Sequence, residues 1–211
     1  MAATRLEMRR QPVTFTVVMR IKTVNLKRHL TAIGSSLLLS GLVLGVSPAS
    51  VRAETAPPEL LERLRSASAI DAPRVEHEVE TIWSRSGSPA MDLLLKRGRD
   101  ALEKGDVPLA IDHFTALTDH APDFAEGYHM RAQAYFRANL YGPALDDLET
   151  TLALNPDNYN AIFGFAIMVQ EFGDLRRAAD LYRRVLAIHP NHEDAKSALG
   201  GLKRDGIGRE L

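Results

Sequence analysis

The chain contains no cysteine among its 211 residues. Disulfide bonds, thiolate zinc sites, iron–sulfur clusters and cysteine nucleophiles are therefore excluded as sources of stability or chemistry. Aromatic residues are also few, at 6%, whereas hydrophobic residues make up 45% of the chain and charged residues 25%. The last two proportions are typical of globular proteins, so they exclude a mostly disordered chain and a multi-span membrane protein.

The net charge of −1 conceals an uneven distribution of charge along the chain. Residues 1–53 carry eight Lys or Arg and one Glu, whereas residues 54–211 carry eighteen Lys or Arg and twenty-six Asp or Glu. The net charges are therefore +7 and −8. An acidic body repels the phosphates of nucleic acids, so we expect no nucleic-acid partner.

Residues 19–53 have the three-part order of a secretory signal peptide. Basic residues at positions 20–28 precede an uncharged apolar run at 30–46, and small residues follow up to Ala53. The run is at or below the length of about 20 residues that spans a bilayer. We therefore predict export to the periplasm with cleavage after Ala53, behind an N-terminal extension at 1–18. The alternatives are a buried core helix and an uncleaved leader, which would be the only membrane contact.

Residues 91–192 contain a repeat with a period of 34 residues. A proline recurs with this spacing, and small residues recur at two further positions of each unit. These positions are Gly98, Ala132 and Ala166, then Ala110, Ala144 and Ala178, and finally Pro122, Pro156 and Pro190. Because proline makes up only about 5% of an average protein, such a set in register is improbable by chance.

Each unit contains two apolar stretches whose spacing is helical. In the first unit, for example, Ala110, Phe114 and Leu117 recur at intervals of four and three residues, which is the period of a helix face. Small residues are needed where two helices approach closely. Each proline disfavours helical geometry in the residue before it and therefore ends a helix. No strand-like alternation occurs within 90–204, so the pattern predicts an all-α fold.

This pattern resembles that of the tetratricopeptide repeat (TPR) family, in particular its exported bacterial members. The family's 34-residue helix–turn–helix has small residues at positions eight and twenty and proline at position thirty-two. The units of this chain would be 91–124, 125–158 and 159–192. The resemblance implies a right-handed α-solenoid of three helix pairs.

A solenoid needs ends that do not expose an apolar face, so we expect helical caps at both ends. Residues 193–211 would form a C-terminal capping helix and a tail. Residues 54–90 contain two amphipathic stretches that lack the small residues and the proline of the repeat. They form either a degenerate repeat or an N-terminal cap that packs on Leu94 and Leu95, with Trp83 in a structural role.

No catalytic or cofactor-binding motif is present in the sequence. It has no Gly-rich phosphate loop, no His-Glu-x-x-His and no nucleophile elbow. His189 and His192 flank a Pro-Asn turn, which is too weak a pattern for a metal site. We therefore predict that the chain is not an enzyme and holds no cofactor or metal.

The resemblance also implies a partner-binding groove. In the family, the first helix of each unit lines a concave surface and contacts ligands through fixed positions. The well-known lysine and asparagine clamp for heat-shock chaperones is absent, because Leu95 and Arg99 occupy two of its positions. Some of the groove positions could instead be core. The residues carried over to this groove are Arg99, His129, Met130, Gln133, Phe136, Asn160, Phe163, Ile167 and Gln170.

The function implied by the resemblance is that of a non-catalytic adaptor for a protein or peptide partner. Together with the export signal, this places the chain in a cell-envelope assembly. Two alternatives remain open. One is a structural subunit that self-associates, and the other is an accessory subunit of an envelope enzyme that remodels polysaccharide.

Overall fold

A computed structural model describes residues 56–204. The signal peptide predicted for 19–53 lies outside these residues. The described part is all-helical and contains no strand, as predicted. Its nine helices are α1 (Pro58–Ser66), α2 (Ala72–Trp83), α3 (Pro89–Glu103), α4 (Val107–His120), α5 (Ala125–Arg137), α6 (Tyr141–Leu154), α7 (Tyr159–Glu171), α8 (Leu175–Ile188) and α9 (Glu193–Arg204).

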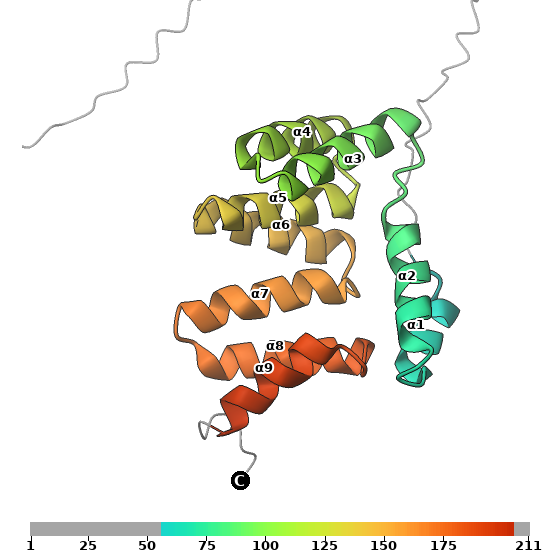
Figure 1. Cartoon of the computed structure of the whole chain (residues 1–211), viewed down its shortest axis with the longest axis vertical. Coiled ribbons are helices and arrows are strands. Elements are labelled where there is room, and N and C mark those ends of the chain that lie inside the picture. The colour runs from blue at the N-terminus through green and yellow to red at the C-terminus, as the bar shows by residue number, and fades with distance from the viewer. Residues whose placement is uncertain (1–55, 205–211) are drawn as a thin grey trace, which may run out of the picture. The chain divides into compact units, whose positions relative to one another are not determined.

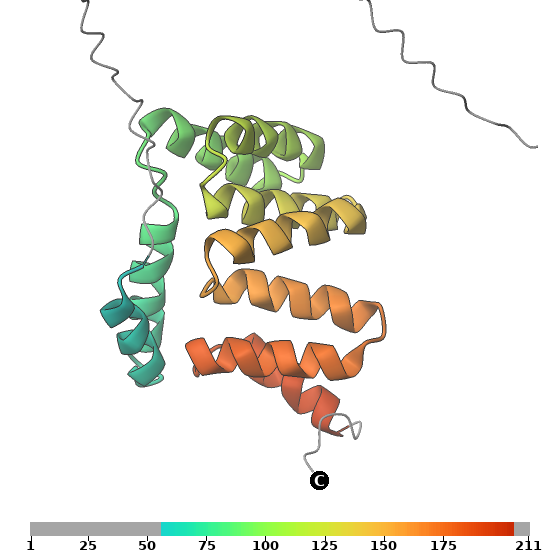
Figure 2. The ribbon, with the colours of Figure 1, turned by 180° about the vertical axis from the view of Figure 1, so that it is seen from behind.

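Helices α3 to α8 form three successive helix pairs, which are the three predicted repeats (Figures 1 and 2). Within each pair the two helices pack against each other, and each pair stacks on the next. Together with α9 they form one array, called the repeat array below.

The small residues of the repeat are required by close helix packing. A Cβ atom at Gly98 would lie 2.3 Å from a ring carbon of Phe114 on α4, so no larger residue fits there without a shift. The equivalent residues Ala132 and Ala166 are 2% and 0% exposed. Ala110, Ala144 and Ala178 on the second helices are completely buried.

The three prolines end the second helices through the residue that precedes each of them. The C-cap residues are Ala121, Asn155 and His189, with φ between −137° and −129° and ψ between 69° and 88°. These values are non-helical, as expected for a residue before proline. The backbone conformation at the end of the second helix is therefore nearly the same in all three units.

The turn within each unit depends on a residue in the left-handed conformation. Gly105, Asn139 and Gly173 have φ values of 77°, 60° and 86°, which glycine and asparagine tolerate best. The side chains of Asp106 and Asp174 then accept a hydrogen bond from a backbone N–H in the first turn of α4 and α8, each at 3.2 Å. Both residues are therefore N-caps of the helices that follow them.

Helix α9 covers the C-terminal end of the array. Its side chains Ala195, Leu199 and Leu202 are buried and share a hydrophobic core with α7 and α8. The apolar face of the last repeat is therefore not exposed to water.

The N-terminal pair, α1 and α2, does not pack on Leu94 and Leu95 as the sequence suggested. Both leucines belong to a separate core of the first repeat, whereas Leu64, Val79 and Trp83 share the core of α5 to α9. Helix α2 lies beside the array, roughly perpendicular to the repeat helices and along the direction in which the repeats stack (Figures 1 and 2). The connection at 84–88 therefore leads the chain away from α7 and α8 and back to the start of the array.

Candidate functional site

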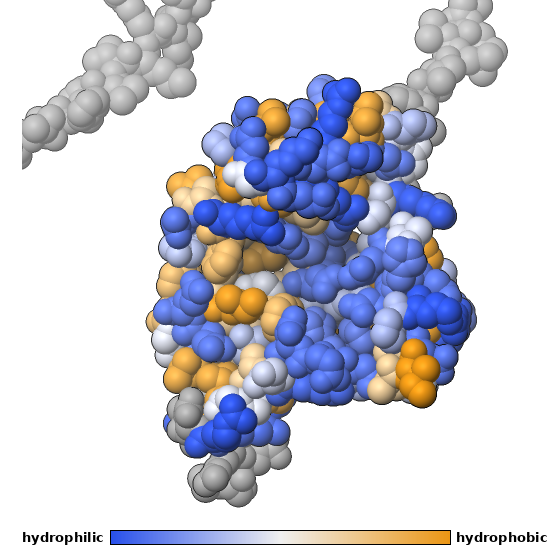
Figure 3. All heavy atoms as spheres, viewed as in Figure 1, coloured by the Kyte–Doolittle hydropathy of each residue, from blue (hydrophilic) through white to orange (hydrophobic). Residues whose placement is uncertain are grey.

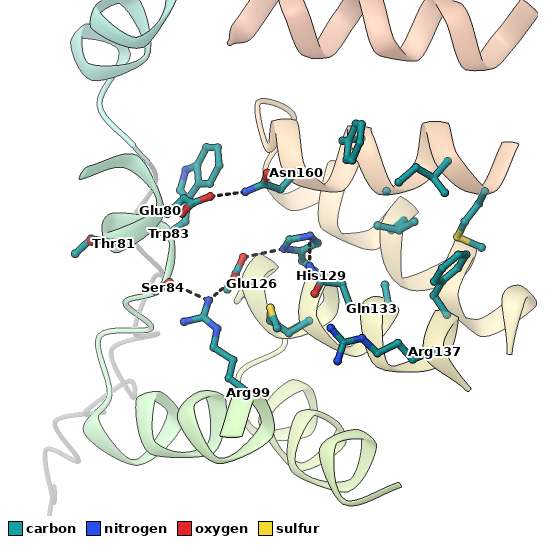
Figure 4. A pocket seen from close by; sticks show the side chains of 18 of the residues that line it. Glu80, Thr81, Trp83, Ser84, Arg99, Glu126, His129, Gln133, Arg137 and Asn160 are labelled. Carbon is teal, nitrogen blue, oxygen red and sulfur yellow. Dashed lines mark hydrogen bonds and ion pairs between the residues drawn. The ribbon is translucent and has the colours of Figure 1, made fainter. Parts of the chain in front are cut away.

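A cavity of about 960 Å³ lies between α2 and the first helices of the repeats. Helix α2 forms one wall, and α3, α5 and α7 supply most of the remaining lining (Figure 4). The volume is within the range of about 300–1,000 Å³ found for ligand sites. On the face shown in Figure 3, hydrophilic side chains predominate over α2, and apolar ones gather at the opposite ends of α5 to α8.

Apolar side chains from α5 and α7 form much of the cavity lining. Met130 is 9% exposed, and Phe136, Phe163 and Ile167 are only half-buried. Phe163 also packs on the His192 ring, with ring centroids 4.8 Å apart. The last three side chains therefore retain surface that a ligand can cover.

A chain of hydrogen bonds runs along the α5 side of the cavity, from Arg99 to Gln133 (Figure 4). Arg99 donates from one nitrogen to the Ser84 hydroxyl at 3.0 Å and to Glu126. The other Glu126 oxygen lies 3.2 Å from His129 Nδ1, and His129 Nε2 lies 3.1 Å from the Gln133 amide nitrogen. Because an ionised carboxylate can only accept, His129 donates from Nδ1 to Glu126.

This network holds Glu126 ionised although its side chain is only 9% exposed. Burial alone would raise the pKa of Glu126, but the adjacent His129 and Arg99 outweigh it and lower the pKa below its ordinary value. Arg99 is therefore a partner of a buried carboxylate. It is not a free anchor for a ligand, because its removal would leave that charge with one partner fewer.

Helix α2 contributes side chains to the cavity that the sequence reasoning missed. The Asn160 amide donates to Glu80 at 2.7 Å, and the Trp83 ring packs on Tyr159 with centroids 5.2 Å apart. Thr81, Ser84 and Arg85 line the same wall. The amphipathic pattern of this stretch and its single Trp were visible in the sequence, but its position across the repeats was not.

Arg137 lies at the far end of the network from α2 (Figure 4). Its side chain is exposed and donates to the Leu102 carbonyl oxygen at 2.9 Å. Within 56–204, no carboxylate lies at ion-pair distance from it, in contrast to Arg99. Arg137 is therefore better placed than Arg99 to bind an acidic or carbonyl group of a ligand.

The structure brings together eight of the nine groove residues named from the sequence. Gln170 does not line the cavity, because its side-chain oxygen accepts a hydrogen bond from the Tyr182 hydroxyl at 2.9 Å. In the described part of the chain, no cluster of three or more His, Asp or Glu residues could hold a metal ion. No helix there is long and apolar enough to cross a membrane.

Comparison with known proteins identifies the repeats. Residues 95–159 and 129–193 match the family model described as tetratricopeptide repeat. A TPR repeat-containing protein of Rhizobium etli is 26% identical over 155 residues, which cover 71% of this chain and 76% of that protein. Sperm-associated antigen 1 of Mus musculus is 32% identical over 109 residues, and the matched part is only 12% of that protein.

Solved structures share the same fold. The first TPR of Spaghetti (RPAP3), solved bound to an HSP90 peptide, is 27% identical with a TM-score of 0.52, covering 55% of this chain and 91% of that chain. The MamA protein, at 19% identity and a TM-score of 0.51, covers 71% of this chain and 84% of that chain. Over residues 95–193, this chain is therefore similar in sequence to the tetratricopeptide repeat family.

Proposed function

We propose that this chain is a non-catalytic adaptor that binds an extended segment of a protein partner in the cavity between α2 and the repeats. The observation that carries the proposal is the half-buried state of Phe136, Phe163 and Ile167 on the cavity lining. Side chains of a sealed core would be fully covered, whereas these keep apolar surface toward an open cavity. Covering such surface is the main favourable term in binding.

Polar groups beside this apolar surface can bind a peptide backbone. Gln133 and Arg137 border it on α5, one turn of helix apart (Figure 4). An amide and a guanidinium both donate to carbonyl oxygens, and a guanidinium also binds carboxylates. An apolar surface with a few placed polar groups is typical of sites that fix one ligand orientation.

The solved relatives support peptide binding without identifying the peptide. The RPAP3 domain was solved with an HSP90 peptide. In this chain Leu95 and Arg99 stand at two positions of the clamp implied for such ligands, and Arg99 is already bonded to Glu126. The partner of this chain is therefore expected to be a different protein.

The basic and apolar segment at 19–53 motivates the second part of the proposal, which is that the adaptor works in the cell envelope. N-terminal sequencing of the protein from the exported fraction is expected to begin at or near Glu54. Recovery of soluble protein that still carries residues 20–53 would contradict cleavage.

The peptide-binding proposal is tested with a displayed library of random peptides selected on the purified chain. Trp83 is the only Trp of the chain and lines the cavity, so its emission reports on occupancy. We expect selected peptides to change this emission saturably, and Ile167→Ala to weaken their binding. Leu109→Ala is the matched control, because Leu109 is 43% exposed on α4 and does not line the cavity. Equal losses in both variants would contradict the proposal.

A further inference from the structure

The lining of the cavity contains a glycine in the middle of a helix. Gly164 is the sixth of the thirteen residues of α7, and it lines the cavity. Glycine destabilises the interior of a helix more than any residue except proline, because it loses the most backbone freedom on folding. A glycine at this place therefore needs a reason, which can lie in packing, in backbone geometry or in a ligand.

Packing between helices does not require this glycine. A Cβ atom added at Gly164 would meet only Leu148 Cδ2, at 3.8 Å, which is ordinary van der Waals contact. At Gly98 the added atom would lie 2.3 Å from a ring carbon of Phe114, and at Gly127 it would lie 3.2 Å from a side-chain atom of α4. Close approach of two helices therefore accounts for Gly98 and Gly127, but not for Gly164.

Backbone geometry does not require the glycine either. Gly87, Gly105 and Gly173 have φ values between 77° and 86°, whereas Gly164 is not among the residues with positive φ. It has the conformation of the helix around it, which alanine adopts more readily. Among residues 56–204, Gly164 is also the only glycine that lines the cavity. The reason that remains is close approach by a ligand, which a glycine permits.

The absence of a side chain at Gly164 leaves a depression in the cavity lining. Leu148 of α6 lies beneath it and lines the cavity although it is only 3% exposed. Ala132 of α5 lines the cavity as well. Ile167 and Phe136 follow Gly164 and Ala132 by three and four residues, so they lie on the same faces of their helices. These five residues define what is called the Gly164 depression below.

The preceding repeat shows which side chain can occupy this place. Met130 in α5 and Phe114 in α4 stand 34 residues before Gly164 and Leu148. Met130 and Phe114 belong to one core, in which Phe114 is completely buried and does not line the cavity. An aliphatic side chain therefore completes the core from the cavity side at the first junction between repeats. At the second junction that side chain is missing.

We infer that the Gly164 depression is a subsite for one aliphatic side chain of the bound peptide. The inference rests on the proposed function and adds which residue the partner segment presents, namely Leu, Ile, Val or Met. All five residues of the depression are apolar, so a charged side chain would lose its hydration there without gaining a partner. The space corresponds to the Met130 side chain of the preceding repeat, which favours an aliphatic residue over the larger Trp.

The first measurement needs no ligand. Gly164→Ala is expected to raise the melting temperature by about 2–4 °C, because alanine favours the helix and the added carbon has space. Gly200→Ala is the matched control, since nothing lies within 4 Å of its added carbon and Gly200 does not line the cavity. It is expected to gain as much. A melting temperature of Gly164→Ala below that of the unmodified chain would show that packing requires the glycine, and would overturn the inference.

The second measurement uses a displayed library of random peptides, selected in parallel on the unmodified chain and on Gly164→Met. Peptides selected on the unmodified chain are expected to share one aliphatic residue and to bind Gly164→Met about ten- to a hundredfold more weakly. Gly200→Met is expected to bind them with unchanged affinity. If Gly164→Met does not fold, Gly164→Ala takes its place, with a smaller loss in the same direction.

The shared aliphatic residue is then replaced by alanine in a selected peptide. This change alone is expected to weaken binding to the unmodified chain by about ten- to a hundredfold. On Gly164→Met the same replacement is expected to cost less than about threefold, because both changes remove one contact. Two losses that multiply in full would place the aliphatic residue elsewhere and overturn the inference.

The outcomes separate this inference from the proposed function. Peptides that change Trp83 emission and are weakened by Ile167→Ala, but bind Gly164→Met with full affinity, would overturn the inference alone. Failure to select any peptide on either chain would contradict both. A dimer of the unmodified chain in light scattering that dissociates in Gly164→Met would assign the depression to a second copy of the chain, and would also overturn the inference.

Discussion

The repeat array and the N-terminal pair are both helical, but they are specified in different ways. In the array, each helix packs on a neighbour close in sequence, so a local pattern that recurs every 34 residues determines its place. The N-terminal pair packs on residues more than 70 positions away, such as Asn160 and Asn191. Local periodicity predicts that the pair is helical but carries no information on where it docks.

The largest loss of stability is expected from Trp83→Ala, which weakens the packing of the N-terminal pair on the array. Removing a buried Trp side chain from a core costs about 3–5 kcal/mol, and Trp83 joins α2 to Tyr159 of the array. Limited proteolysis is expected to cut the variant faster around α1 and α2, with the array still protected. Equal protection of the pair in the variant and the unmodified chain would show that other contacts hold it.

A second variant tests helix packing within the array instead of the docking of the N-terminal pair. Gly98→Ala forces a methyl group against the Phe114 ring and is expected to lower stability by about 1–3 kcal/mol. Gly200→Ala in α9 is the matched control, because nothing lies within 4 Å of the added carbon. Since alanine favours helix over glycine, the control is expected to gain up to about 1 kcal/mol. Thermal unfolding that moves both variants in the same direction would contradict this packing account.

A smaller loss of stability is expected from substitutions at helix N-caps, which differ between the two regions. Asp174 caps α8 through a hydrogen bond from the Arg177 N–H at 3.2 Å, whereas Asp71 before α2 makes no such bond to its helix. Asp174→Ala is therefore expected to lower the free energy of unfolding by about 1 kcal/mol, and Asp71→Ala by less. Urea unfolding of both variants measures the two losses in the free energy of unfolding. Equal losses would contradict this account of the caps.

The sequence was sufficient for the array because its signals are local. The units, the prolines, the small residues and the caps Asp106 and Asp174 follow from patterns within one helix–turn–helix. The charge of Arg131 on α5 is likewise balanced within the array. Arg131 donates two hydrogen bonds to Asp147, at 2.7 and 2.8 Å, and one to Thr118 at 2.7 Å.

The candidate site was less predictable because part of it depends on tertiary contacts. Positions carried over from the family located the array side of the cavity, including Met130 and Ile167. They could not reveal that Arg99 would be bonded to Glu126, or that Gln170 would be bonded to Tyr182. The α2 wall was missed for the same reason as the docking of the N-terminal pair, namely that its contacts are distant in sequence.

The most direct test of the account compares affinity and stability in one double variant. Ile167→Ala with Arg137→Ala truncates an apolar and a cationic side chain on the cavity, and both retain exposed surface. Leu109→Ala with Arg176→Ala is the matched control, with exposed side chains outside the cavity. For a selected peptide, the account predicts a loss of about 2–4 kcal/mol in binding free energy for the cavity variant only, with little change in melting temperature. Unchanged affinity together with a large drop in melting temperature would assign these residues to the core and contradict the proposed binding site.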